Sequence, residues 1–447
     1  MSVDLVIYDG KISVSNAYVT AGVAIDDGKI VKVAKKTNLP SSSEKINLQG
    51  NFILPGLIDV HTHLRDQKQA YEETFGTGTA AAAAGGITLC GDMPNNEPVT
   101  MDSETVKERV HAASGKALTN IAFYSAFPAN PHEIPSMADA GAMAFKLFLT
   151  KQIGGTDIDS DDSLEKVFQQ TKQNHVPVAV HAEDREMLED AQKELKLTHQ
   201  DGFGAYLKAH SPKAEEKAIN RIISLEDKAK AQIHFCHVSS KLGLDRAMNG
   251  KNARLSVTLE VTPQHLLLSS QDLKRLGAVA LCDPPIRGEE DIEALWEALK
   301  NGSIDIIASD HAPHLWEEKS AESIWDVKPG FPGLETTVSL ILNEINKGRL
   351  LIVDLIRLMA EKPAEIFHFS NRGHLERGYS ADITVVDMHR EHKIDASEFH
   401  SKAKYSPFDG WKLKGKPVKT FVNGRLVMDE GQIVARPGVG QIIGRKS

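Results

Sequence analysis

Eight short apolar segments, separated by stretches with helical periodicity, constrain the fold of the middle of this chain most strongly. The apolar segments are residues 52–63, 87–93, 120–127, 142–148, 176–181, 231–238, 255–261 and 304–309. The stretches with helical periodicity are residues 74–84, 163–174, 215–225, 290–300 and 350–367. Strands that are apolar at most positions and alternate with helices are typical of a parallel sheet covered on both faces. The pattern therefore predicts a closed parallel (β/α)₈ barrel, which we place at residues 54–372.

The two ends of the chain differ from the middle and predict short strands joined by tight turns. Apolar runs near the N-terminus are followed by Asp9-Gly10 and by Asp27-Gly28, and Asn423-Gly424 lies between two apolar runs near the C-terminus. Asp-Gly or Asn-Gly between apolar runs favours a β-hairpin. We therefore expect residues 1–53 and 373–447 to form one small β-sandwich domain together.

The composition is that of an ordinary globular protein and argues against several classes of function. Of the 447 residues, 41% are hydrophobic and 25% are charged, and the formal net charge is −9. Because the basic residues are scattered, we expect neither a nucleic-acid nor a membrane surface. The start lacks a signal-peptide pattern, and no apolar run reaches transmembrane length. The three cysteines, Cys90, Cys236 and Cys282, are too few for a disulfide framework, so we expect reduced thiols in a cytoplasmic protein.

Polar side chains gather on the predicted barrel strands. His61 and His63 end the first segment, and because alternate residues of a strand point to the same face, their imidazoles converge. Later segments carry further groups compatible with a metal, namely Lys146, His181, His237 and Asp310. A single histidine of this kind is more often an ordinary core residue, but strand ends of one barrel open at the same mouth. Their joint occurrence therefore predicts a divalent-metal site there.

Lys146 is unusual because phenylalanine and leucine flank it. A buried ammonium is costly unless it is paired or loses its charge. One interpretation is an ion pair with an acidic neighbour. The other is a lysine whose pKa is lowered by burial, and whose neutral amine then reacts with carbon dioxide. The resulting carbamate resembles a carboxylate and could bridge two metals, and the residues alone leave both interpretations open.

The motifs around these residues resemble those of the cyclic amidohydrolases, and the dihydroorotases most closely, over essentially the whole chain. The resemblance rests on residues 59–65 (DVHTHLR), 145–148 (FKLF), 180–183 (VHAE), 236–239 (CHVS) and 309–314 (SDHAPH). It implies two divalent metal ions, typically zinc. His61, His63 and Asp310 would hold one ion, and His181 and His237 the other. It further implies that a carbamylated Lys146 lies between the ions and that Asp310 transfers the proton.

The resemblance also implies a set of substrate contacts. Arg65, Asn95 and His314 stand where dihydroorotases bind the substrate carboxylate, which suits a group of donors that point at one anion. Further substrate-binding positions are Asp283, Pro329 and Gly330. Asp283 departs from the family pattern, in which an asparagine is usual. Cys282 beside it resembles the allantoinases, and residues 66–68 after Arg65 replace the acidic-Pro-Gly turn that is common in the family. These departures keep allantoinase as an alternative.

We therefore expect reversible interconversion of N-carbamoyl-L-aspartate and (S)-dihydroorotate, a step of pyrimidine (UMP) biosynthesis. The alternatives are ring opening by an allantoinase or by a hydantoinase- or dihydropyrimidinase-like enzyme. A non-catalytic scaffold with the same fold is disfavoured because every expected metal ligand is present. The expected partner is a small-molecule substrate. The chain could also form a homodimer or associate with another enzyme of the pyrimidine pathway.

Overall fold

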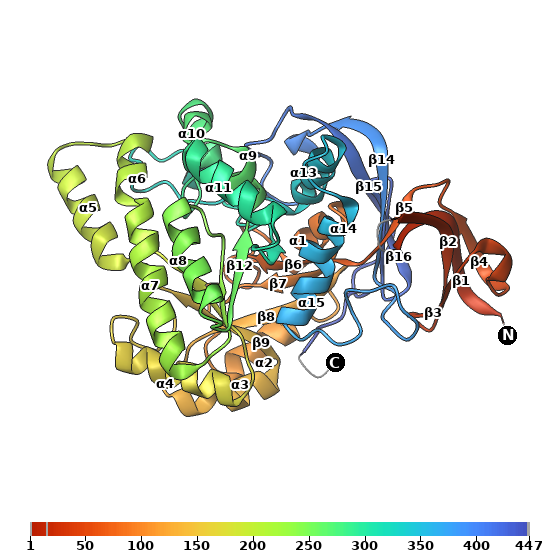
Figure 1. The fold of residues 1–447 in the computed structure, drawn as a ribbon, viewed down its shortest axis with the longest axis horizontal. Coiled ribbons are helices and arrows are strands. Elements are labelled where there is room, and N and C mark those ends of the chain that lie inside the picture. The colour runs from red at the N-terminus through yellow and green to blue at the C-terminus, as the bar shows by residue number, and fades with distance from the viewer. Residues whose placement is uncertain (1, 15–16, 445–447) are drawn as a thin grey trace.

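An eight-stranded parallel barrel forms the centre of the molecule in a computed structural model that describes residues 2–14 and 17–444 (Figure 1). Its strands are β6 (Leu57–Thr62), β7 (Ile87–Asp92), β8 (Asn120–Ala126), β9 (Ala142–Phe148), β10 (Val178–His181), β11 (Ile233–Phe235), β12 (Val257–Val261) and β13 (Ile306–Ile307). They pair in chain order, and a parallel bridge between Thr62 and His311 joins the last strand's end to the first. The predicted (β/α)₈ barrel is confirmed.

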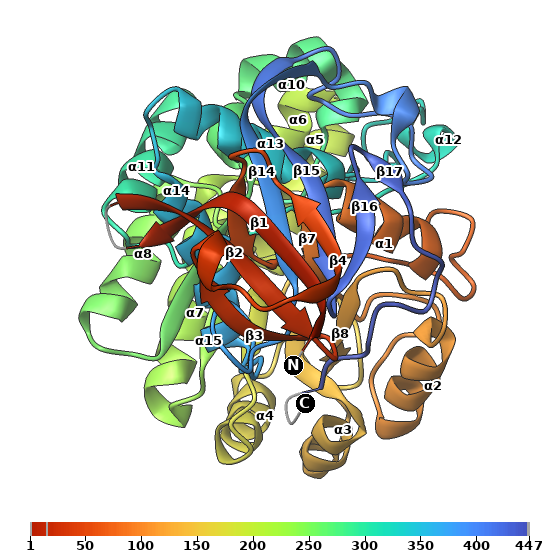
Figure 2. The ribbon, with the colours of Figure 1, turned by 90° about the vertical axis from the view of Figure 1, so that its right-hand side faces the viewer.

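Helices surround this barrel (Figures 1 and 2). They are α1 (Phe75–Ala84), α2 (Ser103–Ala113), α3 (Ile134–Ala140), α4 (Asp161–Gln173), α5 (Arg185–Leu197), α6 (Phe203–Ala209), α7 (Pro212–Ala229), α8 (Lys241–Asn252), α9 (Pro263–Leu267), α10 (Ser270–Leu276), α11 (Glu289–Lys300), α12 (Trp316–Lys319), α13 (Leu334–Asn346), α14 (Ile352–Ile356) and α15 (Lys362–Ile366). Helix α4 shows why such segments fold as they do. The Ser160 side chain caps its first turn, and Leu164, Val167 and Phe168 form one buried stripe. No helix in residues 2–14 and 17–444 is long and apolar enough to cross a lipid bilayer.

Two predicted elements differ from the structure. Residues 52–63 do not form one strand, because β5 (Phe52–Pro55) belongs to the second sheet and only β6 enters the barrel. Gly56 separates the two strands, where a Cβ atom would lie 2.4 Å from the Thr88 hydroxyl. Residues 350–367 are not one regular helix, because a π-helical turn at 357–361 lies between α14 and α15. Apolar periodicity alone does not detect either interruption.

The second sheet has nine strands and combines both ends of the chain. The further strands are β1 (Val3–Val14), β2 (Ala17–Asp26), β3 (Lys29–Ala34), β4 (Ser42–Asn47), β14 (Ile383–Lys393), β15 (Lys412–Val422), β16 (Arg425–Asp429) and β17 (Gln432–Ile433). Strand β5 lies between β1 and β14 and so joins the N-terminal and C-terminal parts. These parts lie side by side in Figure 2. The expected β region built from both termini is confirmed, whereas boundaries at 53/54 and 372/373 stay a prediction.

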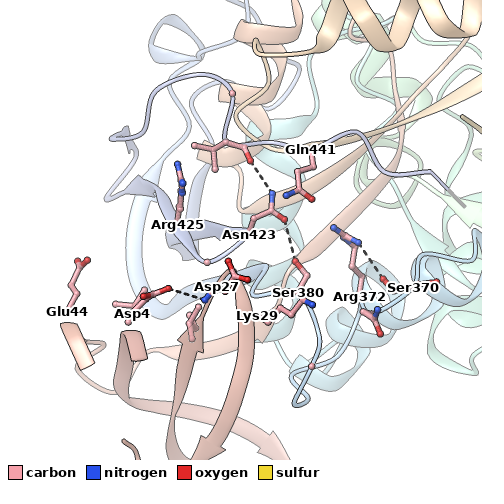
Figure 3. Close-up of a pocket in the computed structure, with 18 residues that line it drawn as sticks. Asp4, Asp27, Lys29, Glu44, Ser370, Arg372, Ser380, Asn423, Arg425 and Gln441 are labelled. Carbon is pink, nitrogen blue, oxygen red and sulfur yellow. Dashed lines mark hydrogen bonds between the residues drawn. The ribbon is translucent and has the colours of Figure 1, made fainter. Parts of the chain in front are cut away.

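Of the three turns predicted in this sheet, two form and one does not. Asp27-Gly28 and Asn423-Gly424 form the β2–β3 and β15–β16 turns, with positive φ at both glycines. Asp9-Gly10 is not a turn, because β1 continues through it as a bulge. Figure 3 shows the two true turns facing each other beside a cavity of about 860 Å³. The Asp382 carboxylate accepts hydrogen bonds from the Asn423 backbone N–H at 2.7 Å and from the side chain of Asn120 in β8 at 3.1 Å, and so connects the C-terminal turn to the barrel.

Candidate active site

A cavity of about 400 Å³ lies at the carboxyl-terminal ends of the barrel strands. The sequence-predicted residues that line it directly are His61, His63, Arg65, Asn95, His181, His237, Asp283, Asp310, His314, Pro329 and Gly330. We call His61, His63, Lys146, His181, His237 and Asp310 the strand-end cluster. We call Arg65, Asn95, Asp283, His314, Pro329 and Gly330 the rim. This position agrees with the general location of active sites in (β/α)₈ barrels.

One half of the strand-end cluster joins the end of β6 to the segment after β13. The Nε2 atoms of His61 and His63 each lie 3.3 Å from Oδ1 of Asp310. Ligand atoms from these three residues lie within 4.8 Å of one another. Asp310 has a φ of 51°, which is uncommon outside glycine and turns its carboxylate toward the histidines.

The other half of the cluster comes from β10 and from the segment after β11. His181 Nδ1 lies 3.2 Å from His237 Nε2. The ring centroids of His237 and His61 are 5.2 Å apart, so the two halves adjoin. His237 Nδ1 is buried and has no hydrogen-bond partner in the described part of the chain. The nitrogen of His237 that faces His181 in the cluster is Nε2, so this ring presents Nε2 and not Nδ1 to His181.

Side chains behind the histidines orient their rings. His61 Nδ1 lies 2.8 Å from a Glu260 carboxylate oxygen, and His181 Nε2 lies 2.9 Å from the Glu183 carboxylate. Fixing one ring nitrogen leaves the other aimed into the site, as in histidine metal sites. The sequence analysis missed Glu260 and Glu183 as site residues. A glutamate inside the apolar strand β12 was the available signal for Glu260.

The protonation states in the cluster favour a cation at Asp310 and His63 but favour a proton at His61. Although burial opposes it, His61 and His63 hold the pKa of Asp310 well below its usual range, so the carboxylate is ionised. Burial lowers the pKa of His63 to about 3, so this imidazole is neutral. Against the effect of burial, Glu260 raises the pKa of His61 to about 10. A cation would therefore compete with a proton at His61.

Lys146 lies between the two halves and is 1% exposed. Its Nζ donates a hydrogen bond to Cys236 Sγ at 3.0 Å and lies 4.9 Å from the centre of the Phe148 ring. Burial, His181 and the charge of Lys146 hold the pKa of His237 well below its usual value, and Lys146 opposes the rise of the His61 pKa. Among residues 2–14 and 17–444 no carboxylate forms an ion pair with Lys146 within 4.0 Å, unlike the first sequence-based interpretation. The converging imidazoles and carboxylate around it fit divalent cations such as zinc.

The rim brings Arg65, Asn95 and His314 to the same cavity. Arg65 is 6% exposed, and its Nη2 lies 3.4 Å from His314 Nε2. The Asn95 side-chain oxygen lies 2.7 Å from His63 Nδ1, so Asn95 also supports the cluster. Glu72, which the sequence analysis missed, lies 3.0 Å from Arg65 Nε and 3.3 Å from His314 Nδ1. The guanidinium therefore already has one anionic partner inside the cavity.

The remaining rim positions are held by contacts with neighbouring loops. Asp283 lies 3.0 Å from His210 Nδ1, and against burial the Asp283 and Glu183 carboxylates raise the pKa of His210 to about 10. The Pro329 carbonyl oxygen lies 3.0 Å from His314 Nε2. Gly330 has a φ of 124°, and a Cβ atom there would lie 2.6 Å from the Ala312 carbonyl oxygen. Only glycine fits this backbone without displacement.

Comparison with known proteins assigns the class of this enzyme. Residues 52–427 match the amidohydrolase family profile, and the chain belongs to that family. It is 37% identical to the dihydroorotase of Pyrococcus horikoshii, over 99% of this chain and 96% of that one. It is 33% identical to the L-hydantoinase of Paenarthrobacter aurescens, over 99% of this chain and 98% of that one.

A solved structure shows the same architecture. The L-hydantoinase (dihydropyrimidinase) of Arthrobacter aurescens superposes with a TM-score of 0.95 and 32% identity, covering 99% of this chain and all of that one. With the fold and family established, the protein is a hydrolase acting on the C–N bonds of cyclic amides. The relatives include enzymes named for substrates with and without a carboxylate. The substrate class of this enzyme must therefore be inferred from the residues of the rim.

Proposed function

We propose that this enzyme is a dihydroorotase that interconverts N-carbamoyl-L-aspartate and (S)-dihydroorotate in pyrimidine (UMP) biosynthesis. The observation that carries the proposal is the Arg65 guanidinium, which lies beside His314 in the cavity that holds the strand-end cluster. Dihydroorotate carries a carboxylate, and a guanidinium binds carboxylates with a planar fork of donors. Glu72 lies 3.0 Å from Nε of Arg65, and Nη2 of Arg65 lies beside His314.

Two lysines add positive charge to the same cavity. Lys151 and Lys328 line it, and within the described residues neither side chain has an ion-pair partner at 4.0 Å or less. Because the same lining also carries the carboxylates of Glu72, Asp283, Asp310 and Glu318, these lysines and Arg65 offer local contacts for an anion and do not give the cavity a net positive charge. Cytoplasmic location, a homodimer and association with another pathway enzyme remain predictions.

The strand-end cluster would hold the metal ions. His61, His63 and Asp310 would hold one zinc ion and His181 and His237 a second, with Lys146 between them as a carbamate. Bound there, the ions would supply Lewis acidity, which lowers the pKa of water and polarises a carbonyl. The carbamate would form when the neutral Lys146 amine adds to the carbon of carbon dioxide and loses one proton.

The chain's own groups would bind the substrate and move the proton. Arg65, Asn95 and His314 would hold the substrate carboxylate, so that the ring carbonyl lies over the strand-end cluster. Asp310 would accept a proton from the attacking water and deliver it to the ring nitrogen that leaves. In the direction of ring closure the same carboxylate would carry the proton the opposite way.

The second candidate is ring opening of a cyclic amide without a carboxylate, such as hydantoin or allantoin. The observation that favours it is the contact between Glu72 and Arg65, which neutralises part of the charge that a substrate carboxylate would need. The similarity to L-hydantoinases supports the same alternative.

A parallel assay of the zinc-loaded protein on dihydroorotate, hydantoin and allantoin separates the candidates. We expect the highest kcat/KM for dihydroorotate, together with ring closure of N-carbamoyl-L-aspartate. A preference for hydantoin or allantoin would contradict the dihydroorotase assignment and leave the class of reaction intact.

The state of Lys146 has its own test. The intact protein should carry the added mass of one carbon dioxide, and the map of a metal-loaded crystal should show a carbamate on Nζ. Lys146→Ala should lose activity and regain part of it with short carboxylic acids, which substitute for the carbamate. Fully active protein with an unmodified lysine would disprove the carbamate.

A further inference from the structure

Lys319 is a buried lysine whose ammonium forms no ion pair with an acidic residue of the described chain. It is the last residue of α12 and is 1% exposed. Its Nζ donates hydrogen bonds to the backbone carbonyls of Leu281 at 3.2 Å, Lys328 at 2.8 Å and Gly330 at 2.9 Å. An ammonium has three N–H donors, so these bonds use its full capacity. The carbonyl dipoles provide the compensation that a buried charge requires.

The three carbonyls belong to two segments that form one wall of the active-site cavity. Leu281 lies two residues before Asp283, and residues 328–330 line the cavity themselves. The Gly330 backbone N–H also donates to the Leu281 carbonyl at 2.8 Å. Lys319 does not line the cavity, so it contacts the wall only from behind.

We propose that Lys319 is a positioning residue, whose ammonium holds the segments around Asp283 and Gly330 in the arrangement that binds the cyclic amide. The inference requires a cyclic amide in the cavity and is independent of whether that amide is dihydroorotate. Because Lys319 acts on the wall and not on Asp310, loss of its charge raises KM and leaves kcat nearly unchanged.

The charge on Lys319 depends on pH near neutrality. Burial lowers the pKa of Lys319 from 10.5 to about 7. The neutral amine has only two N–H donors, so one carbonyl loses its hydrogen bond when the proton leaves. All three bonds are therefore present below pH 7, and one of them is lost as the pH rises above it. KM is low on the acidic side and increases on the basic side.

Other ionisable groups face the same region. On the packed segments they are Tyr206, Cys282, Asp283, His314, Glu317, Glu318, Lys328 and Tyr405. Of these, only Cys282 contributes to the pKa of Lys319, where it opposes the effect of burial. Burial itself raises the pKa of the Cys282 thiol far above its usual range, so this thiol stays neutral while Lys319 titrates. After burial and the effects of Glu72 and Arg65, the charge of Lys319 also helps to lower the pKa of His314.

The test compares Lys319→Met with a matched lysine on the other side of the barrel. Lys251 donates to the Ser303 carbonyl at 2.7 Å and to Asp305 at 2.6 Å, before β13 begins. With the cyclic amide that the metal-loaded wild type hydrolyses best, well below pH 7, Lys319→Met should raise KM about tenfold and change kcat less than about threefold. Lys319→Met should also abolish the rise of KM with pH, and Lys251→Met should keep wild-type KM and its pH dependence.

Hydrogen–deuterium exchange gives a readout that does not depend on turnover. Lys319→Met should speed exchange in residues 281–283 and 328–331 but not in β8. A wild-type KM in Lys319→Met, or unchanged exchange in both segments, overturns the proposal. If Lys319→Met does not fold, the pH dependence of hydrogen–deuterium exchange in the wild type provides the test. After correction for intrinsic rates, exchange in these segments must rise above pH 7, and its absence refutes the role. A wild type that is inactive on dihydroorotate refutes only the dihydroorotase assignment.

Discussion

The strand-end cluster and the rim share one cavity but are built from different parts of the barrel. The cluster residues lie on parallel strands or directly after them, and register places them together. The rim residues lie on loops. Glu72 contacts Arg65 within the loop between β6 and α1, whereas His210 reaches Asp283 from a different loop. In such a barrel, strand geometry therefore positions the reactive groups of the strand-end cluster, whereas contacts between loop residues position the groups of the rim that select a substrate.

The electrostatics of the two regions differ in the same way. In the cluster, Glu260 and Glu183 lie behind the histidines and leave the front of each ring open. In the rim, Glu72 lies inside the cavity against Arg65. A carboxylate behind a ligand orients it, but a carboxylate beside a binding group competes with the substrate. The predictions below test whether the two regions are separable.

The largest effect is expected for Asp310→Ala. Under the proposed function, loss of this carboxylate would remove both a metal ligand and the proton carrier, so kcat should fall by about three orders of magnitude or more for every cyclic amide. The barrel should remain folded by circular dichroism, and elemental analysis should show less than the expected two metal ions per chain. If Asp310→Ala loses its fold as well as its activity, the result would contradict a role of Asp310 that is confined to the site. Near-normal turnover in thoroughly metal-stripped wild type would contradict the metal assignment.

Arg65→Ala should produce the next largest effect, and only for substrates with a carboxylate. Loss of the guanidinium should weaken transition-state binding of dihydroorotate by about 2–5 kcal/mol, mostly through KM. Arg65→Lys should also be damaging, because a point charge does not reproduce the planar fork. Hydantoin turnover is the internal control and should change little. Normal kinetics of Arg65→Ala with dihydroorotate would rule out the carboxylate clamp.

Glu260→Gln should have an intermediate effect on the cluster. The amide orients His61 poorly, so metal affinity or activity should fall by about 10–100-fold, without a change in substrate preference. The matched control is Glu344→Gln, which alters a buried carboxylate that pairs with Lys347 and Arg349 away from the cavity. A shift in the ratio of dihydroorotate to hydantoin turnover would show that cluster and rim are coupled.

Glu72→Gln should have the smallest effect, with the opposite sign. Removing the competing charge should strengthen dihydroorotate binding by about 1 kcal/mol, which lowers KM a few-fold. KM for hydantoin should stay within error, because a neutral ring gains nothing from the unmasked guanidinium. A higher KM for dihydroorotate would mean that Glu72 holds Arg65 in its binding position, not that it competes with the substrate.

Sequence alone predicted the barrel and the strand-end cluster because both depend on local regularities. Apolar segments alternating with helical periodicity are specific to a covered parallel sheet. The two-residue spacing of His61 and His63 places both rings on one face, and strand ends of a barrel meet at one mouth. His181, His237 and Asp310 could therefore be assigned to the same place without knowledge of any contact.

The tertiary structure alone decided which groups pair across the cavity and behind it. Glu72 and Arg65 are close in sequence, but their contact depends on loop conformations with positive φ at Arg65 that no periodicity predicts. Glu260 and His61 are 199 residues apart, and Lys319 joins two loops through backbone carbonyls that every residue type carries. Periodic burial leaves a trace in the sequence because it repeats. A single long-range polar contact does not repeat, so only the folded chain reveals it.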